Sequence, residues 1–94
     1  MTTDPVGQFV HDPDAVLDYS IEWRSWLPTG DSISSASWTV PSPLVLVAES
    51  LSGSRATVWV SGGVVGGDHR ITCHVVTAEG REDDRSIRLV VAER

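Results

Sequence analysis

The sequence predicts an all-β protein, an antiparallel β-sandwich of about seven short strands. Two observations support this fold. Apolar and polar residues alternate along a series of short segments, as in strands with one buried face, and no segment shows sustained helical periodicity. Turn-forming Gly, Pro, Asp and Ser residues separate these segments at near-regular spacing. Many short strands with regular turns are typical of sandwiches of the immunoglobulin type.

The first residues differ from the rest of the chain. Residues 1–12 show no clear periodicity, a proline and a glycine interrupt regular structure, and Phe9 and Val10 form the only apolar pair. We therefore predict an extended N-terminal arm over residues 1–12 that becomes ordered against a partner, followed by the sandwich over residues 13–94. Plain terminal disorder of the arm is the alternative.

Alternation along the remaining chain predicts which side chains face the core. Ile33 is out of phase with the strand that follows it, so a β-bulge or a late start of the strand is expected between residues 33 and 36. The run from Leu44 to Val47 is continuously apolar, which predicts a buried strand. The residues expected to face the core are Tyr19, Ile21 and Trp23; Ala36, Trp38 and Val40; Ala56, Val58 and Val60; Ile71, Cys73 and Val75, which share their face with His69; and Ile87, Leu89 and Val91.

The most informative stretch spans residues 57–73. An alternating segment meets Gly62-Gly63, and Gly66-Gly67 precedes the next alternating segment. Glycine pairs permit positive φ and tight reversals, so this stretch predicts a strand, a corner and a second strand. Farther along, residues 78–81 predict a hairpin turn.

Composition and charge exclude several functional classes. The 94 residues make a single domain, and the formal net charge is -6. All basic residues are arginines and none lies in residues 1–23, so the basic face of a nucleic-acid-binding protein is missing. No apolar run is long enough to span a membrane. The single cysteine, Cys73, forms no internal disulfide and is expected in the core of a protein made in a reducing cytoplasm.

Residues with catalytic or metal-binding chemistry form no recognisable site. His69 and His74 lie five apart on one predicted strand and so point to opposite faces. No zinc-ligand spacing or nucleophile elbow occurs, and neither a lysine nor a helix follows the glycine pairs as a phosphate loop requires. The acidic run 82–84 is expected to be a solvated loop with local ion pairs. We therefore expect no enzymatic activity, no metal and no cofactor.

Six blocks follow one another in a characteristic order along the chain: Asp12-Pro13-Asp14-Ala15-Val16-Leu17-Asp18-Tyr19; Trp23 with Trp26-Leu27; Gly30-Asp31-Ser32-Ile33; Ser37-Trp38-Thr39-Val40-Pro41; Thr57-Val58-Trp59-Val60-Ser61-Gly62-Gly63; and Gly80-Arg81 with Asp83-Asp84-Arg85-Ser86-Ile87. From about residue 12 to residue 91, the chain resembles small tailed-phage proteins described as fibre-tail adaptors or immunoglobulin-like virion proteins.

The resemblance implies an immunoglobulin-like sandwich that is a non-catalytic structural protein of the virion, an adaptor or accessory module at the neck or tail. It implies partners among other phage structural proteins of the connector, tail or capsid, several copies in a symmetric assembly, and synthesis in the host bacterial cytoplasm. Decoration of the head surface, or a sandwich that binds carbohydrate or a cell surface, is the alternative function.

Exposed apolar and aromatic side chains are where such a module would meet its partners, because these residues dominate interface energetics. For each tryptophan a core position is the alternative, and for the glycine-rich loop a simple connection between strands is the alternative. The candidate partner-binding residues are Phe9 and Val10 in the predicted arm, Trp26 and Trp59, and Val64 and Val65 between the glycine pairs.

Overall fold

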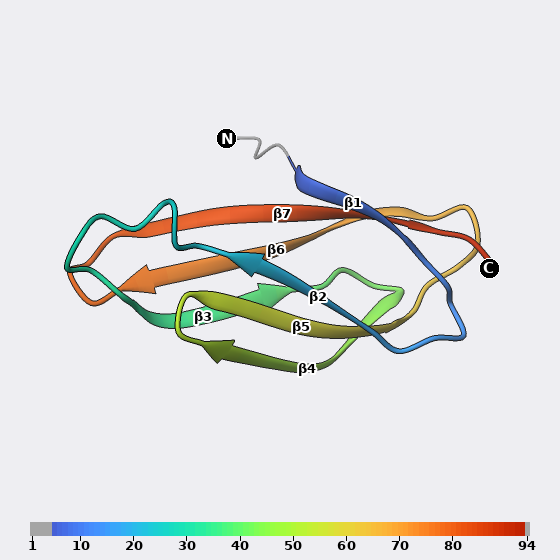
Figure 1. Ribbon diagram of the computed structural model, residues 1–94. Helices are drawn as coiled ribbons and strands as arrows, with labels where there is room; N and C mark the ends of the chain where they lie inside the picture. The colour runs from blue at the N-terminus through green and yellow to red at the C-terminus, as the bar shows by residue number, and fades with distance from the viewer. Residues whose placement is uncertain (1–4, 94) are drawn as a thin grey trace.

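The computed structural model describes residues 5–93, which form two β-sheets packed face to face (Figure 1). One sheet has four strands in the order β1-β7-β6-β3, and the other has three in the order β2-β5-β4. The predicted all-β sandwich is confirmed. The strands are β1 (Pro5–His11), β2 (Leu17–Glu22), β3 (Ile33–Thr39), β4 (Leu44–Ser52), β5 (Arg55–Gly62), β6 (Asp68–Thr77) and β7 (Glu82–Val91).

The strand order is close to that of an immunoglobulin domain, with one difference. The orders β2-β5-β4 and β3-β6-β7 correspond to strands B-E-D and C-F-G of the seven-stranded immunoglobulin arrangement. In that arrangement the first strand extends the sheet of the second strand, whereas β1 here pairs with β7 and runs parallel to it. The first strand therefore belongs to the opposite layer.

The segment predicted as an N-terminal arm contributes this first strand. Residues 5–11 form β1, in which Phe9 pairs with Leu89 and His11 pairs with Val91. They are ordered within the sandwich, whereas the sequence predicted an arm ordered against a partner; residues 1–4 of that arm lie outside the described residues. The alternation of apolar and polar residues did not indicate this strand, because two of its inward-facing positions hold Gly7 and His11, and only Phe9 between them is a large apolar residue.

The core lies between the sheets, where the predicted inward-facing residues meet. The predicted bulge is confirmed as a register shift between Ile33 and Ser35, and Ala36 and Val40 lie partly buried against the core. The other predicted core residues are buried: Tyr19, Ile21, Trp23, Trp38, Ala56, Val58, Val60, Ile71, Cys73, Val75, Ile87, Leu89 and Val91.

The prediction for β4 is wrong. Only Leu44 of its apolar run is buried, while Val45 and Val47 are more than half exposed. The strand lies at the edge of its sheet, and its register against β5 shifts between Leu46 and Ala48. Because an edge strand has one neighbour and little cover on its outer face, a continuous apolar run there leaves part of its surface exposed.

The predicted corner carries the chain from β5 in one sheet to β6 in the other. Gly63 has a φ of 100°, and a Cβ atom at this position would lie 3.0 Å from Val91 Cγ2 and 3.1 Å from Leu44 Cδ2. The loop then bonds to the end of β7, where the Gly66 amide donates to the Val91 carbonyl at 2.9 Å. A glycine is therefore required at position 63 by both backbone conformation and space.

Replacement of a buried aromatic residue tests the core. Trp38 is 7% exposed, so Trp38→Ala should lower the free energy of unfolding by about 3–5 kcal/mol. Val64→Ala, at a position 64% exposed, should change it by less than about 0.5 kcal/mol. Urea denaturation followed by tryptophan fluorescence measures both, and a Trp38→Ala change below about 1 kcal/mol would contradict the burial of this ring.

A matched pair of glycine substitutions tests the corner. Gly66 has a φ of 93° with open space around it, so Gly66→Ala carries only backbone strain, about 1–2 kcal/mol. Gly63→Ala adds contact with Leu44 and Val91 and should cost a further 1–3 kcal/mol, roughly. Thermal unfolding should therefore rank wild type, Gly66→Ala and Gly63→Ala in falling order, and equal losses for the two variants would show that the close approach carries no cost.

Candidate partner-binding surfaces

Trp59 lies on the outer face of the three-stranded sheet. Its neighbours Val58 and Val60 point into the core, so the indole points outward, with 36% of its surface exposed. The strand register places it between Ala48 on β4 and Asp18 on β2. Trp59 is therefore an accessible aromatic side chain with a small residue on one side and a carboxylate on the other.

Val45 extends this surface toward the corner. It pairs with Ser61 on β5, and its Cγ2 atom would lie 3.7 Å from a Cβ atom at Gly62. Val64 and Val65 follow in the loop and are 64% and 56% exposed. We call Val45, Trp59, Val64 and Val65 the apolar strip. It includes three of the predicted partner-binding residues, and Val45 is one that the sequence did not single out.

The other predicted binding residues lie elsewhere. On β1, Phe9 packs against Tyr19 with ring centroids 5.4 Å apart and stays about half exposed, and Val10 lies beside Val90 of β7. Trp26 is partly buried and packs edge-on against Trp23, with centroids 5.2 Å apart. The six candidates therefore do not form one patch, and Trp26 contributes mainly to packing.

The outer face of the four-stranded sheet carries a group of paired polar side chains. Arg88 of β7 donates to Asp68 of β6 and also to Gln8 of β1. His74 of β6 lies between Asp84 and Glu82 of β7, at 2.5 and 2.9 Å. Hydrogen bonds with Asp84 and Glu82 raise the pKa of His74. The two outer faces of the sandwich therefore differ: this one carries paired charges beside exposed valines of β1, and the other carries the apolar strip.

A buried polar pair that the sequence did not reveal links β1 to β2. The His11 ring is fully buried, and its Nδ1 atom lies 2.7 Å from the Tyr19 hydroxyl. Burial lowers the pKa of His11, and the charge of Asp12 partly opposes this shift. The only signal in the sequence was a histidine two residues after Phe9, on the same face of a strand. This pair ties the two sheets together near the end of β1.

A second polar cluster lies at the opposite end of the sandwich. The Asp31 carboxylate is buried and accepts hydrogen bonds from the Ser32 amide at 2.9 Å, the Glu79 amide at 3.1 Å and the Arg81 guanidinium at 2.9 Å. Burial pushes its pKa upward, but the bonds it accepts from Thr77, Ser32, Arg81 and Glu79 outweigh this and lower the pKa. Asp31 thereby joins the β2–β3 connection to the β6–β7 hairpin.

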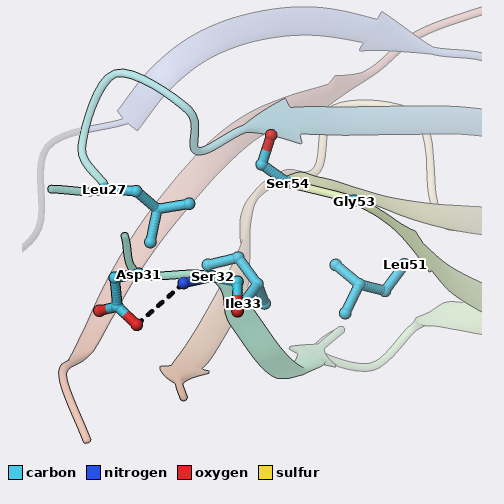
Figure 2. Close-up of a pocket in the computed structure, with 7 residues that line it drawn as sticks. All are labelled: Leu27, Asp31, Ser32, Ile33, Leu51, Gly53 and Ser54. Atoms are coloured by element: carbon cyan, nitrogen blue, oxygen red, sulfur yellow. Dashed lines mark hydrogen bonds between the residues drawn. The ribbon is translucent and has the colours of Figure 1, made fainter. Parts of the chain in front are cut away.

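An open groove of about 450 Å³ adjoins this cluster. Figure 2 shows Leu27 and Leu51 on either side of Ile33, with the Asp31 carboxylate bonded to the Ser32 amide. Gly53 and Ser54 of the β4–β5 turn complete the lining. Because the carboxylate is already occupied by donors from the protein, the groove offers mainly apolar contact.

Two features are not found among the described residues: a cluster of candidate metal ligands and a helix long and apolar enough to span a bilayer. Among residues 5–93, no group of three or more His, Cys, Asp or Glu residues is placed to hold a metal ion. Within the same range, no helix has the length and apolar character needed to cross a bilayer. Cys73 is buried, and this burial raises its pKa to about 11, so its thiol stays protonated near neutral pH.

The two perturbed histidines predict opposite pH dependences of stability. His11 has a folded-state pKa below 6.5, so its contribution is complete above pH 6.5 and is lost as the pH falls from 6.5 through the folded-state value. His74 has a folded-state pKa above 6.5, so its contribution is complete below pH 6.5 and is lost as the pH rises through that value. His74 is exposed, which makes its effect the smaller one.

Thermal unfolding of His11→Gln and His74→Gln, measured between about pH 5.5 and 8.5, tests this assignment. His11→Gln should flatten the fall in melting temperature below pH 6.5, and His74→Gln should flatten the decline above it. Each variant serves as the control for the other. Parallel pH profiles for wild type and His11→Gln would contradict the buried, neutral state of His11.

Comparison with known proteins supplies the functional context. Residues 11–90 match the family model described as Podophage GP4 fiber-tail adaptor protein gp77. The match includes β2 to β6 and nearly all of β7, and it begins at the last residue of β1. A search of curated proteins found no match.

Proposed function

We propose that this chain, which belongs to the podophage GP4 fiber-tail adaptor protein gp77 family, binds its two kinds of partner at opposite ends of the sandwich. As a member of this family it is a structural component of the phage tail, and hence of the virion, and it is not an enzyme. A fibre-tail adaptor contacts tail fibres and tail proteins. The proposal concerns which surfaces of this chain make those contacts.

The shape of the molecule supports contacts at two ends. The sandwich measures 43 × 25 × 18 Å, and its long axis follows the strands (Figure 1). The loop of the apolar strip lies at one end, and the groove lined by Leu27, Ile33 and Leu51 lies at the other. An adaptor must be able to hold two partners at once without one blocking the other, and this separation allows it.

The apolar strip is the observation on which the proposal depends. Val45, Val64 and Val65 are each more than half exposed, and Trp59 adds an aromatic side chain. Exposed apolar side chains commonly mark a protein interface, and aromatic anchors often dominate its binding energy. The groove would take an apolar side chain of the second partner, held by Leu27 and Leu51.

Several copies in a symmetric assembly would strengthen both contacts. Each end of this small sandwich offers a modest area, and repeated modest contacts add up to strong attachment when the copies are held together.

We propose that synthesis takes place in the host bacterial cytoplasm. The buried, protonated thiol of Cys73 and the absence of a second cysteine agree with this.

Two variants should block different junctions. Val64→Asp with Val65→Asp places charges in the apolar strip, and Leu51→Asp places one at the groove. Each variant is expressed in a phage that lacks the gene. The variant that blocks the junction with the tail should be missing from the tails. The variant that blocks the junction with the fibre should be present on tails that lack fibres. Negative-stain electron microscopy and mass spectrometry of purified particles distinguish these results.

The controls for this experiment are direct. Wild-type complementation should restore fibres, and thermal unfolding should show that each variant folds. If both variants produce the same defect, the assignment of partners to opposite ends is wrong. If the wild-type protein is missing from purified virions, the adaptor function itself fails.

A further inference from the structure

We propose that Trp59 and Asp18 together form a binding site for an arginine side chain of the partner that covers the apolar strip. This inference rests on the proposed function and specifies the chemistry of that partner. The two residues are direct neighbours in the antiparallel pairing of β2 with β5. The buried side chains of Tyr19, Val58 and Val60 point inward, so both Asp18 and Trp59 point outward.

The geometry suits a planar cation. Side chains that lie directly opposite each other in an antiparallel pair have Cβ atoms about 5 Å apart, so one group can touch both. An arginine can stack its guanidinium on an indole and donate two parallel hydrogen bonds to a carboxylate. Ala48, the neighbour of Trp59 on β4, is too small to cover the ring, and this leaves room for the incoming group.

One charged side chain on this face has no ion-pair partner among residues 5–93. Arg55 lies 3.7 Å from Glu22, which also accepts a hydrogen bond from Ser54, so both charges have partners. Among residues 5–93, Asp18 forms no ion pair. A partner that covered Trp59 with apolar surface alone would bury the Asp18 carboxylate without compensation, which is costly. A partner with a positive charge at this position avoids that cost.

The chain itself uses the same chemistry at another place. The guanidinium carbon of Arg85 lies 4.6 Å from the centroid of the Trp23 ring. Trp23 therefore has a cation from the chain itself over its ring. Among residues 5–93, no cation lies over the ring of Trp59, and the neighbour of this ring is the Asp18 carboxylate. A partner arginine at Trp59 would complete an equivalent arrangement and add an ion pair to it.

Charge also decides against a second copy of this chain as the occupant. The net charge is -6, and residues 1–23 contain acidic but no basic side chains. Pairing two such faces would bring like charges together around the strip, and this repulsion opposes association. The preferred occupant is therefore a different protein that presents an arginine surrounded by aliphatic side chains, which pack against Val45.

The test measures binding of the full chain to two probes: adaptor-free tails and purified tail fibres of the phage that encodes it. Asp18→Asn preserves the size of the side chain and should weaken binding to one probe by about tenfold or more. Trp59→Leu keeps an apolar side chain but removes the aromatic face, and it should also weaken binding to that probe. Asp83→Asn, which removes one charge from another strand, is the matched control and should bind like wild type.

Chemical modification of that probe identifies the cation. Phenylglyoxal, which modifies arginine, should weaken wild-type binding but have little further effect on Asp18→Asn, because the two changes remove the same interaction. Acetylation of lysines should leave wild-type binding unchanged. Sedimentation of the isolated protein should show a monomer, and thermal unfolding should show that all variants are folded.

Three results would overturn the arginine site. The first is unchanged binding of Asp18→Asn to both probes, the second is an equal loss for Asp83→Asn, and the third is loss of wild-type binding on lysine acetylation alone. Dimerisation that Trp59→Leu abolishes would assign the face to a second copy instead. The adaptor function fails separately, if wild-type protein binds neither probe.

Discussion

The close approach at Gly63 is the constraint on which the arrangement of the two sheets depends. At this residue the chain leaves β5 and crosses to the other layer, with Leu44 on one side and Val91 on the other. The crossing is so tight that a Cβ atom would already crowd both neighbours, so it fixes how the ends of β4, β5 and β7 meet. The same crossing projects Val64 and Val65 out of the body. The exposed apolar loop is thus a direct product of the packing beneath it.

Two polar clusters hold the ends of the sandwich in different ways. Near the end of β1, the buried His11 and Tyr19 connect the layers through one hydrogen bond in an apolar setting. At the opposite end, Asp31 collects donors from two loops through a saturated carboxylate. A buried carboxylate with several donors is strongly favoured in its charged form, whereas a buried histidine is favoured as neutral. The first cluster is therefore sensitive to mild acid, and the second resists it.

The sequence predicted the parts of the fold in which local pattern and burial agree. Parts of β2, β5, β6 and β7 have apolar residues at every second position, over residues 19–21, 56–60, 71–75 and 87–91, and these residues are buried. β1 was missed because Gly7 and His11 occupy two of its inward positions, and the burial of His11 depends on Tyr19 in another strand. β4 was misread because composition does not reveal whether a strand lies in the centre or at the edge of a sheet.

In the candidate site, too, the sequence predicted the features that depend on local pattern and missed those that depend on distant strands. Val64, Val65 and Trp59 were identifiable as exposed because they lie in a loop or alternate with core residues. Their neighbours were not identifiable, since Asp18, Ala48 and Val45 come from strands that are distant in sequence, and only the register brings them together. What Trp59 can bind thus depends on the residues on either side of it in the sheet.

Exposed apolar surface carries a risk for a protein that must remain soluble before assembly. An edge strand with free backbone groups and apolar side chains tends to pair with another copy of itself. In β4 the register shift after Leu46 disturbs the ladder, and Glu49 adds a charge close by. The acidic balance of the chain adds repulsion between copies. The same negative charge attracts a basic partner. The charge that keeps copies apart therefore also favours binding of that partner to the apolar strip. Specificity on this face would then come from charge, and much of the binding energy from the apolar strip.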